Sequence, residues 1–215
     1  MKKTTAAAIS FHLNVLLLIL EFLGIGGYYV IGALTHGMPF LPYFKYFTTL
    51  SNFLVGVAAA CMLPYEFRRL KGKEVEPSTW LMVLKLAGTT AVAITITVVT
   101  CYLGPVFATV KEVLIGGNNT FLHGLCPILS IVTFVFFDGG TPLTKKQSWP
   151  ALLPGGIYVL VYFAMNLLHV KGWSDFYNFN YHGHWRLAFV LLMLLNYLLV
   201  KMLRILHNKF CDTAM

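Results

Sequence analysis

The chain has 215 residues, of which 58% are hydrophobic and only 11% are charged, and its mean hydropathy is +0.72. A water-soluble domain of this size carries about twice that share of charged residues, because one small core cannot bury so much apolar surface. The composition therefore excludes an ordinary soluble domain. We interpret the net charge of +8 as a signal of membrane orientation rather than of nucleic-acid binding, because the basic residues lie in short loops between apolar segments.

Six apolar segments follow one another along the chain, and each is close to the roughly 20 residues that a helix needs to cross a bilayer. They predict an all-α, polytopic membrane protein that forms a bundle of six transmembrane helices in a single domain, residues 1–215. The first segment is longer than the apolar region of a secretory signal, so we interpret it as a span. The six spans are expected at residues 9–33, 45–63, 80–102, 121–137, 152–169 and 185–205.

The basic residues of the loops predict the direction of these spans. Eleven lie near the two termini and in the segments 66–79 and 138–149, whereas four lie in or next to the segments 35–44, 103–120 and 170–184. Basic residues accumulate on the cytoplasmic side of a membrane. We therefore expect both termini in the cytoplasm, and a multi-pass protein of the plasma membrane if the organism is a prokaryote.

Polar residues near the outer start of the second span form the first candidate site. Side chains of this kind are costly in lipid unless they are paired, so their position is informative. On a helix Thr48 and Asn52 are i,i+4 neighbours, and Ser51 lies beside them. Thr49 follows Thr48 directly. The pattern predicts one polar face on an otherwise apolar helix.

His123 lies at the outer start of the fourth span, at a depth similar to that of Thr48. A hydroxyl next to an imidazole is the minimum for a nucleophile with a general base. Cys126, three residues after His123, is expected to face the same way and is a rival nucleophile. The structural alternative is that Thr48 and His123 only join neighbouring helices by hydrogen bonds. The residues alone leave both interpretations open.

The outer segment 170–184 is rich in aromatic and polar residues, among them Trp173 and Asp175. It is interpreted either as an aromatic belt at the membrane interface or as a lid over a cavity that opens outward. In the second case Asp175 is a candidate for orienting His123.

Glu21 and Lys85 are the charged residues that lie farthest from the ends of the predicted spans. Glu21 is near the middle of the first span, where it either bonds a neighbouring helix or marks an ion path, as in a transporter. Lys85, in the third span, either pairs with Glu21 or extends to the inner surface. No metal-ligand spacing is present among the cysteines and histidines, so no metal and no cofactor is predicted.

Two short runs carry a resemblance to a known family. The run Phe44-Lys45-Tyr46-Phe47-Thr48, with Asn52 just after it, resembles the aromatic–basic–aromatic–x–Thr signature of the androgen-induced protein family. That family consists of six-span membrane proteins, and this chain is more similar to its prokaryotic branch. The run Leu122-His123-Gly124-Leu125-Cys126-Pro127 resembles the family's His followed within a turn by Pro. The segment 172–176 is similar to the family's aromatic loop but lacks its proline.

The resemblance implies an activity. The animal members are threonine hydrolases that cleave fatty acid esters of hydroxy fatty acids inside the membrane, and the two catalytic residues map to Thr48 and His123. Thr49 is the alternative if the alignment slips by one residue. Asn52 or a backbone amide near Gly124 is then the candidate donor to the oxyanion. The partners implied are the lipid bilayer and a lipid ester. A transporter and a non-catalytic membrane protein remain as alternatives, and the oligomeric state is left open.

Overall fold

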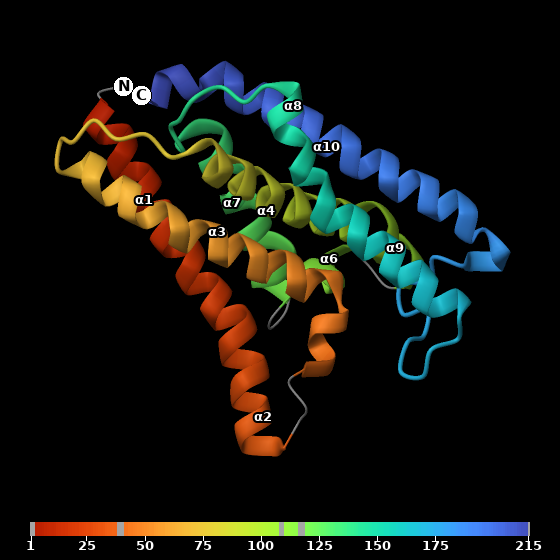
Figure 1. Cartoon of the computed structure of the whole chain (residues 1–215). Coiled ribbons are helices and arrows are strands. Elements are labelled where there is room, and N and C mark those ends of the chain that lie inside the picture. Colours follow the sequence, from red (N-terminus) through yellow and green to blue (C-terminus); the bar gives the residue numbers. More distant parts are fainter. Residues whose placement is uncertain (1–2, 38–40, 108–109, 116–118, 215) are drawn as a thin grey trace.

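The computed structural model describes residues 3–37, 41–107, 110–115 and 119–214 (Figure 1). Within these ranges all regular structure is helical, which confirms the prediction of an all-α protein. The helices η1, η3 and η4 are π-helical, and η2, η5 and η6 are 3₁₀-helical. In chain order the helices are α1 (Lys3–Glu21), η1 (Phe22–Val30), α2 (Ile31–His36), η2 (Leu41–Lys45), α3 (Phe47–Leu70), α4 (Thr79–Val98), η3 (Val99–Leu103), α5 (Gly104–Phe107), α6 (Val110–Leu114), η4 (Thr120–Leu125), α7 (Cys126–Phe136), α8 (Lys145–Ser148), η5 (Trp149–Leu152), α9 (Leu153–Leu167), η6 (Tyr181–Gly183) and α10 (Trp185–Ala214).

Among the described residues, five continuous helical stretches are long and apolar enough to cross a membrane. A shorter apolar helix, Thr120–Phe136, lies where the fourth span is predicted. The chain is therefore a helical, multi-pass membrane protein. The five long stretches are Thr5–Thr35, Phe47–Leu70, Thr79–Val106, Lys145–Leu167 and Trp185–Cys211.

Prolines explain where helix bounds differ from the predicted spans. Helix α3 continues through Pro64 to Leu70, although the second span was expected to end at residue 63. A proline inside a helix removes one backbone hydrogen bond, which membrane helices tolerate when neighbouring helices support them. The stretch Lys145–Leu167, at the fifth predicted span, begins well before the expected residue 152. Pro150 and Pro154 each lie in the first turn of a helical segment, where a missing N–H costs little.

Helix α4 lies at the centre of the bundle and packs against α3, α7, α9 and α10 (Figure 1). Of its most apolar stretch 72% is buried, compared with 22–44% for the other long helices, whose remaining apolar surface is free to face lipid. Gly88 allows α3 to approach closely, since a Cβ atom at this position would lie 3.2 Å from Cα of Val55. Small residues at such crossings are typical of membrane bundles.

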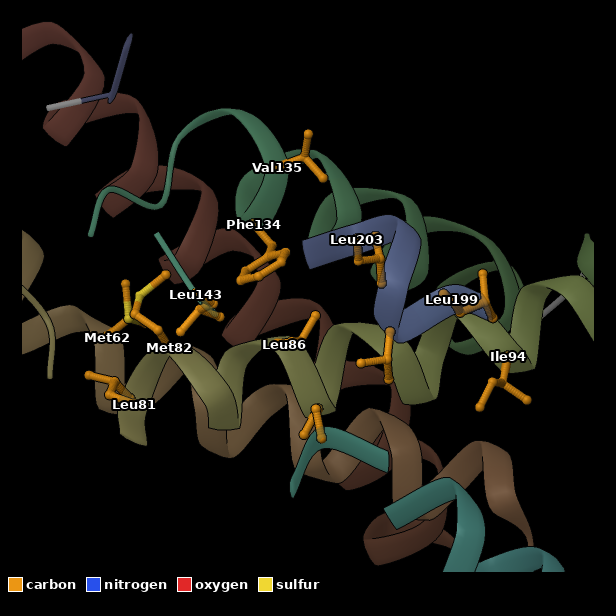
Figure 2. Packing of buried hydrophobic residues seen from close by; sticks show 14 residues of the cluster. Met62, Leu81, Met82, Leu86, Ile94, Phe134, Val135, Leu143, Leu199 and Leu203 are labelled. Carbon is orange, nitrogen blue, oxygen red and sulfur yellow. The ribbon is translucent and has the colours of Figure 1, made fainter. Parts of the chain in front are cut away.

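Large apolar side chains from four helices pack along α4 from Leu81 to Ile94 (Figure 2). Met62 of α3, Leu81 and Leu86 of α4, Phe134 of α7 and Leu203 of α10 are fully buried there. Because lipid is as apolar as these side chains, their close packing, rather than exclusion from water, stabilises the contact between the helices.

A buried ionic network joins α1, α4 and the end of α7. The Lys85 side chain is 1% exposed, its Nζ lies 3.5 Å from Oδ2 of Asp138, and it donates a hydrogen bond of 2.5 Å to Oδ1 of Asn14. Oδ1 of Asp138 accepts hydrogen bonds from Oγ of Ser10 (2.8 Å) and Nδ2 of Asn14 (2.9 Å). Both expectations for Lys85 are therefore wrong, because it neither pairs with Glu21 nor reaches the surface. Asp138 supplies the nearby carboxylate that makes a buried lysine possible.

The network predicts the effect of removing one charge. Lys85→Met keeps the length of the side chain but leaves Asp138 as an unpaired buried carboxylate, which costs about 3–5 kcal/mol in comparable cases. We expect a large fall in the midpoint of thermal unfolding in detergent. The double variant Lys85→Met with Asp138→Asn should recover part of that loss, because an asparagine still accepts the Ser10 hydrogen bond without a charge. A single variant as stable as the original protein would contradict the prediction.

Candidate functional site

A narrow pocket with a cavity volume of about 40 Å³ lies toward the end of α4 that is remote from Lys85. Its walls are mostly aliphatic and aromatic, and threonine and tyrosine hydroxyls are the main polar groups. The walls come from α3, α4, η3, α9, α10 and the segment that connects α9 to α10. The lining residues are Phe47, Thr48, Ile94, Thr95, Val98, Val99, Leu103, Gly155, Tyr158, Val159, Tyr162, Phe163, Tyr177, Phe179 and Leu192.

Helix α3 begins at this pocket without a side-chain cap of its own. Tyr46, the residue before the helix, has an extended backbone (φ −85°, ψ 133°) and makes no capping hydrogen bond with its side chain. The first N–H groups of a helix have no acceptor within the helix. The N–H of Phe47 instead donates to the hydroxyl of Tyr177 over 2.9 Å. A residue 130 positions later in the chain thus caps the helix that carries Thr48.

The structure places the hydroxyl of Thr48 next to the imidazole of His123. The distance from Thr48 Oγ1 to His123 Nε2 is 3.4 Å, and both side chains are half-buried. Contacts between a hydroxyl nucleophile and its base are often this long before a substrate is bound. Thr48 lines the pocket, whereas His123 is not among the lining residues. The imidazole is therefore in position to act on the pocket through the Thr48 hydroxyl.

A proline determines how the segment of His123 is held. Cys126 donates its N–H to the carbonyl of Phe121, the i−5 pattern of a π-helix. In the same pattern the carbonyl of Leu122 would accept from residue 127, which is Pro127 and has no N–H. Nδ2 of Asn52 fills this vacancy, because it donates to Leu122 O over 3.0 Å.

The same Asn52 amide also donates to the carbonyl of Thr48 over 2.7 Å. Both of its hydrogens are thus used by backbone acceptors, one on each of the two segments that carry the hydroxyl and the imidazole. The sequence suggested Asn52 as a donor to an oxyanion, but in the structure its amide bridges two backbone carbonyls. It holds Thr48 and His123 at a fixed separation.

Ser51 and Thr49, the other polar residues of this helix turn, are both buried. Ser51 Oγ bonds to the Thr48 carbonyl (3.0 Å) and to Oγ1 of Thr95 (2.9 Å), and so joins α3 to α4 beside the pocket. Thr49 is 1% exposed and is not among the residues that line the pocket. Of the two adjacent threonines, Thr48 is thus the one that the pocket reaches.

Cys126 does not join the hydroxyl–imidazole pair. It is fully buried in an apolar cluster with Leu17 and Val92, and its thiol lies next to the Glu21 carboxyl. The expectation that it faces the same way as His123 assumed an α-helix. The π-helical turn η4 has more residues per turn, so positions three apart no longer lie on one face. Both carboxyl oxygens of Glu21 are buried without a hydrogen-bond partner among the described residues.

Asp175 was a candidate for orienting His123, but its hydrogen bonds organise the segment between α9 and α10 instead. Its Oδ1 accepts hydrogen bonds from the Tyr162 hydroxyl (2.5 Å) and from the N–H of Phe179 (2.9 Å), and its Oδ2 accepts from the N–H of Asn180 (2.7 Å). Trp173 packs edge-on against Tyr162. Both residues therefore act on the shape of the outer segment, which closes one side of the pocket.

Tyr177 is the residue of the site that sequence reasoning did not single out. Its hydroxyl faces the backbone N–H groups of Phe47 and Thr48 and the hydroxyls of Thr48 and Tyr158. Burial raises the pKa of Tyr177 to about 12, and the surrounding donors lower it only in part. The hydroxyl consequently keeps its proton at neutral pH and can donate it in a hydrogen bond. The aromatic residues of segment 170–184 were the only signal for it.

Fold and site together define a multi-pass helical membrane protein with a half-buried hydroxyl–imidazole pair beside an apolar pocket. Within the described ranges, no group of three or more His, Cys, Asp or Glu side chains is arranged to hold a metal ion. Comparisons with protein families, with characterised proteins and with solved structures gave no match.

The role of Asn52 generates a prediction about stability. Asn52→Ala leaves the carbonyl of Leu122 buried without a donor, which costs about 1–3 kcal/mol. We expect a lower unfolding midpoint in detergent. Asn166→Ala is the matched control, because that amide bonds to the Tyr162 carbonyl within its own helix. Equal destabilisation by the two variants would show that the link between α3 and η4 contributes no more to stability than a hydrogen bond within one helix.

Proposed function

We propose that the chain is a membrane hydrolase of lipid esters, with Thr48 as the nucleophile and His123 as the general base. The observation that carries this proposal is the 3.4 Å contact between Thr48 Oγ1 and His123 Nε2 at the wall of an apolar pocket. A hydroxyl becomes a competent nucleophile when an adjacent base accepts its proton. The resemblance of the Phe44–Thr48 and Leu122–Pro127 runs to the androgen-induced protein family supports the same assignment.

The proposed reaction has two steps. In the first, His123 accepts the proton of the Thr48 hydroxyl while Thr48 Oγ1 bonds to the ester carbonyl carbon. The bond from that carbon to the alcohol oxygen then breaks, and His123 returns the proton to the departing alcohol. In the second step His123 accepts a proton from water, which attacks the acyl-threonine ester. The fatty acid leaves, and the threonine oxygen regains a proton from His123.

Negative charge on the carbonyl oxygen needs a donor in both steps. The amide of Asn52 is engaged by two backbone carbonyls. The Tyr177 hydroxyl is neutral at physiological pH and faces that of Thr48, so we assign to it the stabilisation of the oxyanion. The first N–H groups of α3 polarise the tyrosine oxygen and strengthen its O–H as a donor.

The walls of the pocket support a fatty acyl group as the part of the substrate that is bound. They are built almost entirely from aliphatic and aromatic side chains, which suit a hydrocarbon chain and offer no charged partner. Fatty acid esters of hydroxy fatty acids, the substrates of the family that the chain resembles, carry such an acyl group. We therefore propose this ester class or a similar one.

We further propose six spans with both termini in the cytoplasm, the short helix Thr120–Phe136 being the fourth. Figure 1 shows the start of α1 and the end of α10 at the same end of the bundle, which supports an even number of crossings. The eleven basic residues at that end favour the cytoplasmic side. The Thr48 pocket then lies in the outer half of the membrane, which is the plasma membrane in a prokaryote.

Glu21 favours a second candidate function, a proton-coupled transporter, because its carboxyl oxygens are buried without a partner among the described residues. Such a function needs a polar path across the bundle. Apolar side chains that include Leu17, Val55 and Val92 pack in this part of the bundle. The buried hydroxyls of Thr89 and Ser130, which bond to each other over 2.8 Å, also lie there, one turn beyond Lys85 and Cys126. Among the described residues no continuous chain of hydrogen bonds joins Glu21 to Lys85, so we place the transporter second.

Covalent labelling tests the nucleophile. A fluorophosphonate with a fatty chain should label the detergent-purified protein, and Thr48→Ala should abolish labelling because the attacking oxygen is gone. His123→Ala should slow labelling by about 10²–10⁴-fold, the usual contribution of a general base. The measurement is the labelling rate constant from in-gel fluorescence, with the unfolding midpoint of each variant as the check on folding.

Thr49→Ala is the matched control and should label at the original rate. If it abolishes labelling while Thr48→Ala does not, the nucleophile is the neighbouring threonine. A wild-type protein that is never labelled, over several chain lengths and pH values, would refute the hydrolase and favour the transporter.

Substitution of the assigned oxyanion donor gives another prediction. Tyr177→Phe should lower kcat for a lipid ester by about 10²–10³-fold with a smaller change in KM, because the donor acts mainly on the transition state. Tyr102→Phe is the control, since the Tyr102 hydroxyl anchors the same outer segment through the Asn178 carbonyl (2.6 Å) without lining the pocket. Equal losses of kcat in the two variants would show that Tyr177 only anchors the outer segment and does not act on the oxyanion.

A further inference from the structure

A separate groove with a volume of about 160 Å³ lies between α10 and the helical segment formed by α8 and η5. Figure 1 shows these elements side by side. The α8–η5 wall consists of Lys145, Ser148, Trp149 and Leu152. Their spacing is i, i+3, i+4 and i+7, so they form one face of a continuous helical segment. That face is basic at its first residue and apolar at its last.

Helix α10 supplies the opposite wall with the same spacing. Tyr197, Val200, Lys201 and Arg204 line the groove. Here the basic residues come last along the chain and the aromatic residue comes first. Because Lys145 and the pair Lys201/Arg204 all belong to the end of the bundle that is rich in basic residues, the groove is cationic at that end and apolar toward the middle of the membrane.

The positive charge of the groove is not neutralised by the described part of the chain. No acidic residue lines the groove, and none of its three basic side chains has a carboxylate partner among the described residues. Arg204 is partly fixed, because one guanidinium nitrogen donates to the Leu143 carbonyl over 3.3 Å. Its remaining N–H groups stay free for an anion. Lys145 and Lys201 are exposed.

The surface next to the apolar end is suited to hydrocarbon. Leu153 and Ile157 of α9 and Leu194 and Leu198 of α10 are all exposed, at 48–57% of their surface. Trp149, at the rim of the groove, is 66% exposed, as aromatic residues at the level of lipid headgroups usually are. The order of basic, aromatic and aliphatic groups thus follows the order of phosphate, glycerol and acyl chain in a phospholipid.

We infer that this groove binds one anionic phospholipid, with its phosphate between Lys145, Lys201 and Arg204 and an acyl chain along Leu152 and α10. Basic pockets between helices on the cytoplasmic side are a recurrent form of binding site for anionic headgroups. The site is independent of the proposed hydrolase, because it shares no lining residue with the Thr48 pocket.

A displacement experiment tests this site. The full chain, purified in a non-ionic detergent, binds phosphatidylglycerol that carries a fluorescent acyl chain, and fluorescence anisotropy gives the Kd. Unlabelled phosphatidylglycerol should displace it about tenfold more effectively than phosphatidylcholine with the same acyl chains, because the choline headgroup cancels the phosphate charge. Lys145→Gln with Lys201→Gln should raise the Kd about 30-fold, from about 1 kcal/mol for each basic residue.

The control is Lys146→Gln with Lys209→Gln, which removes the same charge from two exposed lysines at the same end that do not line the groove. Its Kd should stay near the original value. Equal losses in the two double variants, or equal displacement by phosphatidylcholine, would overturn the proposal. Displacement by millimolar sodium phosphate alone would also overturn it, because the occupant would then be a soluble anion rather than a lipid. All four lysines are exposed, so neither double variant removes a buried contact.

Discussion

Pro127 has no N–H to offer the carbonyl of Leu122, and the geometry of the candidate site follows from how that vacancy is filled. In hydrocarbon a backbone carbonyl has no water to bond, so a donor must come from another helix. Asn52 provides it and at the same time bonds the carbonyl of Thr48. The distance between the hydroxyl and the imidazole is thus set by one amide that bridges two backbone segments, rather than by the two side chains themselves.

The polar residues around Thr48 and those around Lys85 form two layers of the bundle that differ in character. The layer around Thr48 borders an aromatic pocket, whereas the layer around Lys85 and Asp138 is dense, paired and linked to three parts of the chain. A buried ion pair contributes little net stability over apolar packing, but it requires one particular partner. We interpret the layer around Lys85 as the one that fixes the register of α1 and α4. We interpret the layer around Thr48 as the one that contains the proposed reactive groups.

The fold could be predicted largely from hydropathy, since runs of about 20 apolar residues suffice to locate membrane helices. The approach of Thr48 to His123 corresponds to an expectation based on loop charge, on depth and on the resemblance of two short runs to a known family. Other features were beyond such reasoning. The position of Cys126 depends on a π-helical turn, which spacing rules for α-helices do not include. Asp138 is followed by two glycines and resembles the start of a loop, and its burial is explained by contacts with Ser10, Asn14 and a lysine 53 positions earlier.

The distribution of the site along the chain has a consequence for biogenesis. Thr48 is on α3, His123 is on the fourth apolar segment, and Tyr177 follows α9. A nascent chain that has inserted its first four apolar segments therefore already holds the proposed nucleophile and the proposed base. Helix α3 still lacks its cap at this stage, and the pocket lacks the walls from α9 and α10. If the proposed activity is correct, the translocating chain is inert toward the lipids around it. Hydrolysis would begin only when synthesis and insertion are nearly complete.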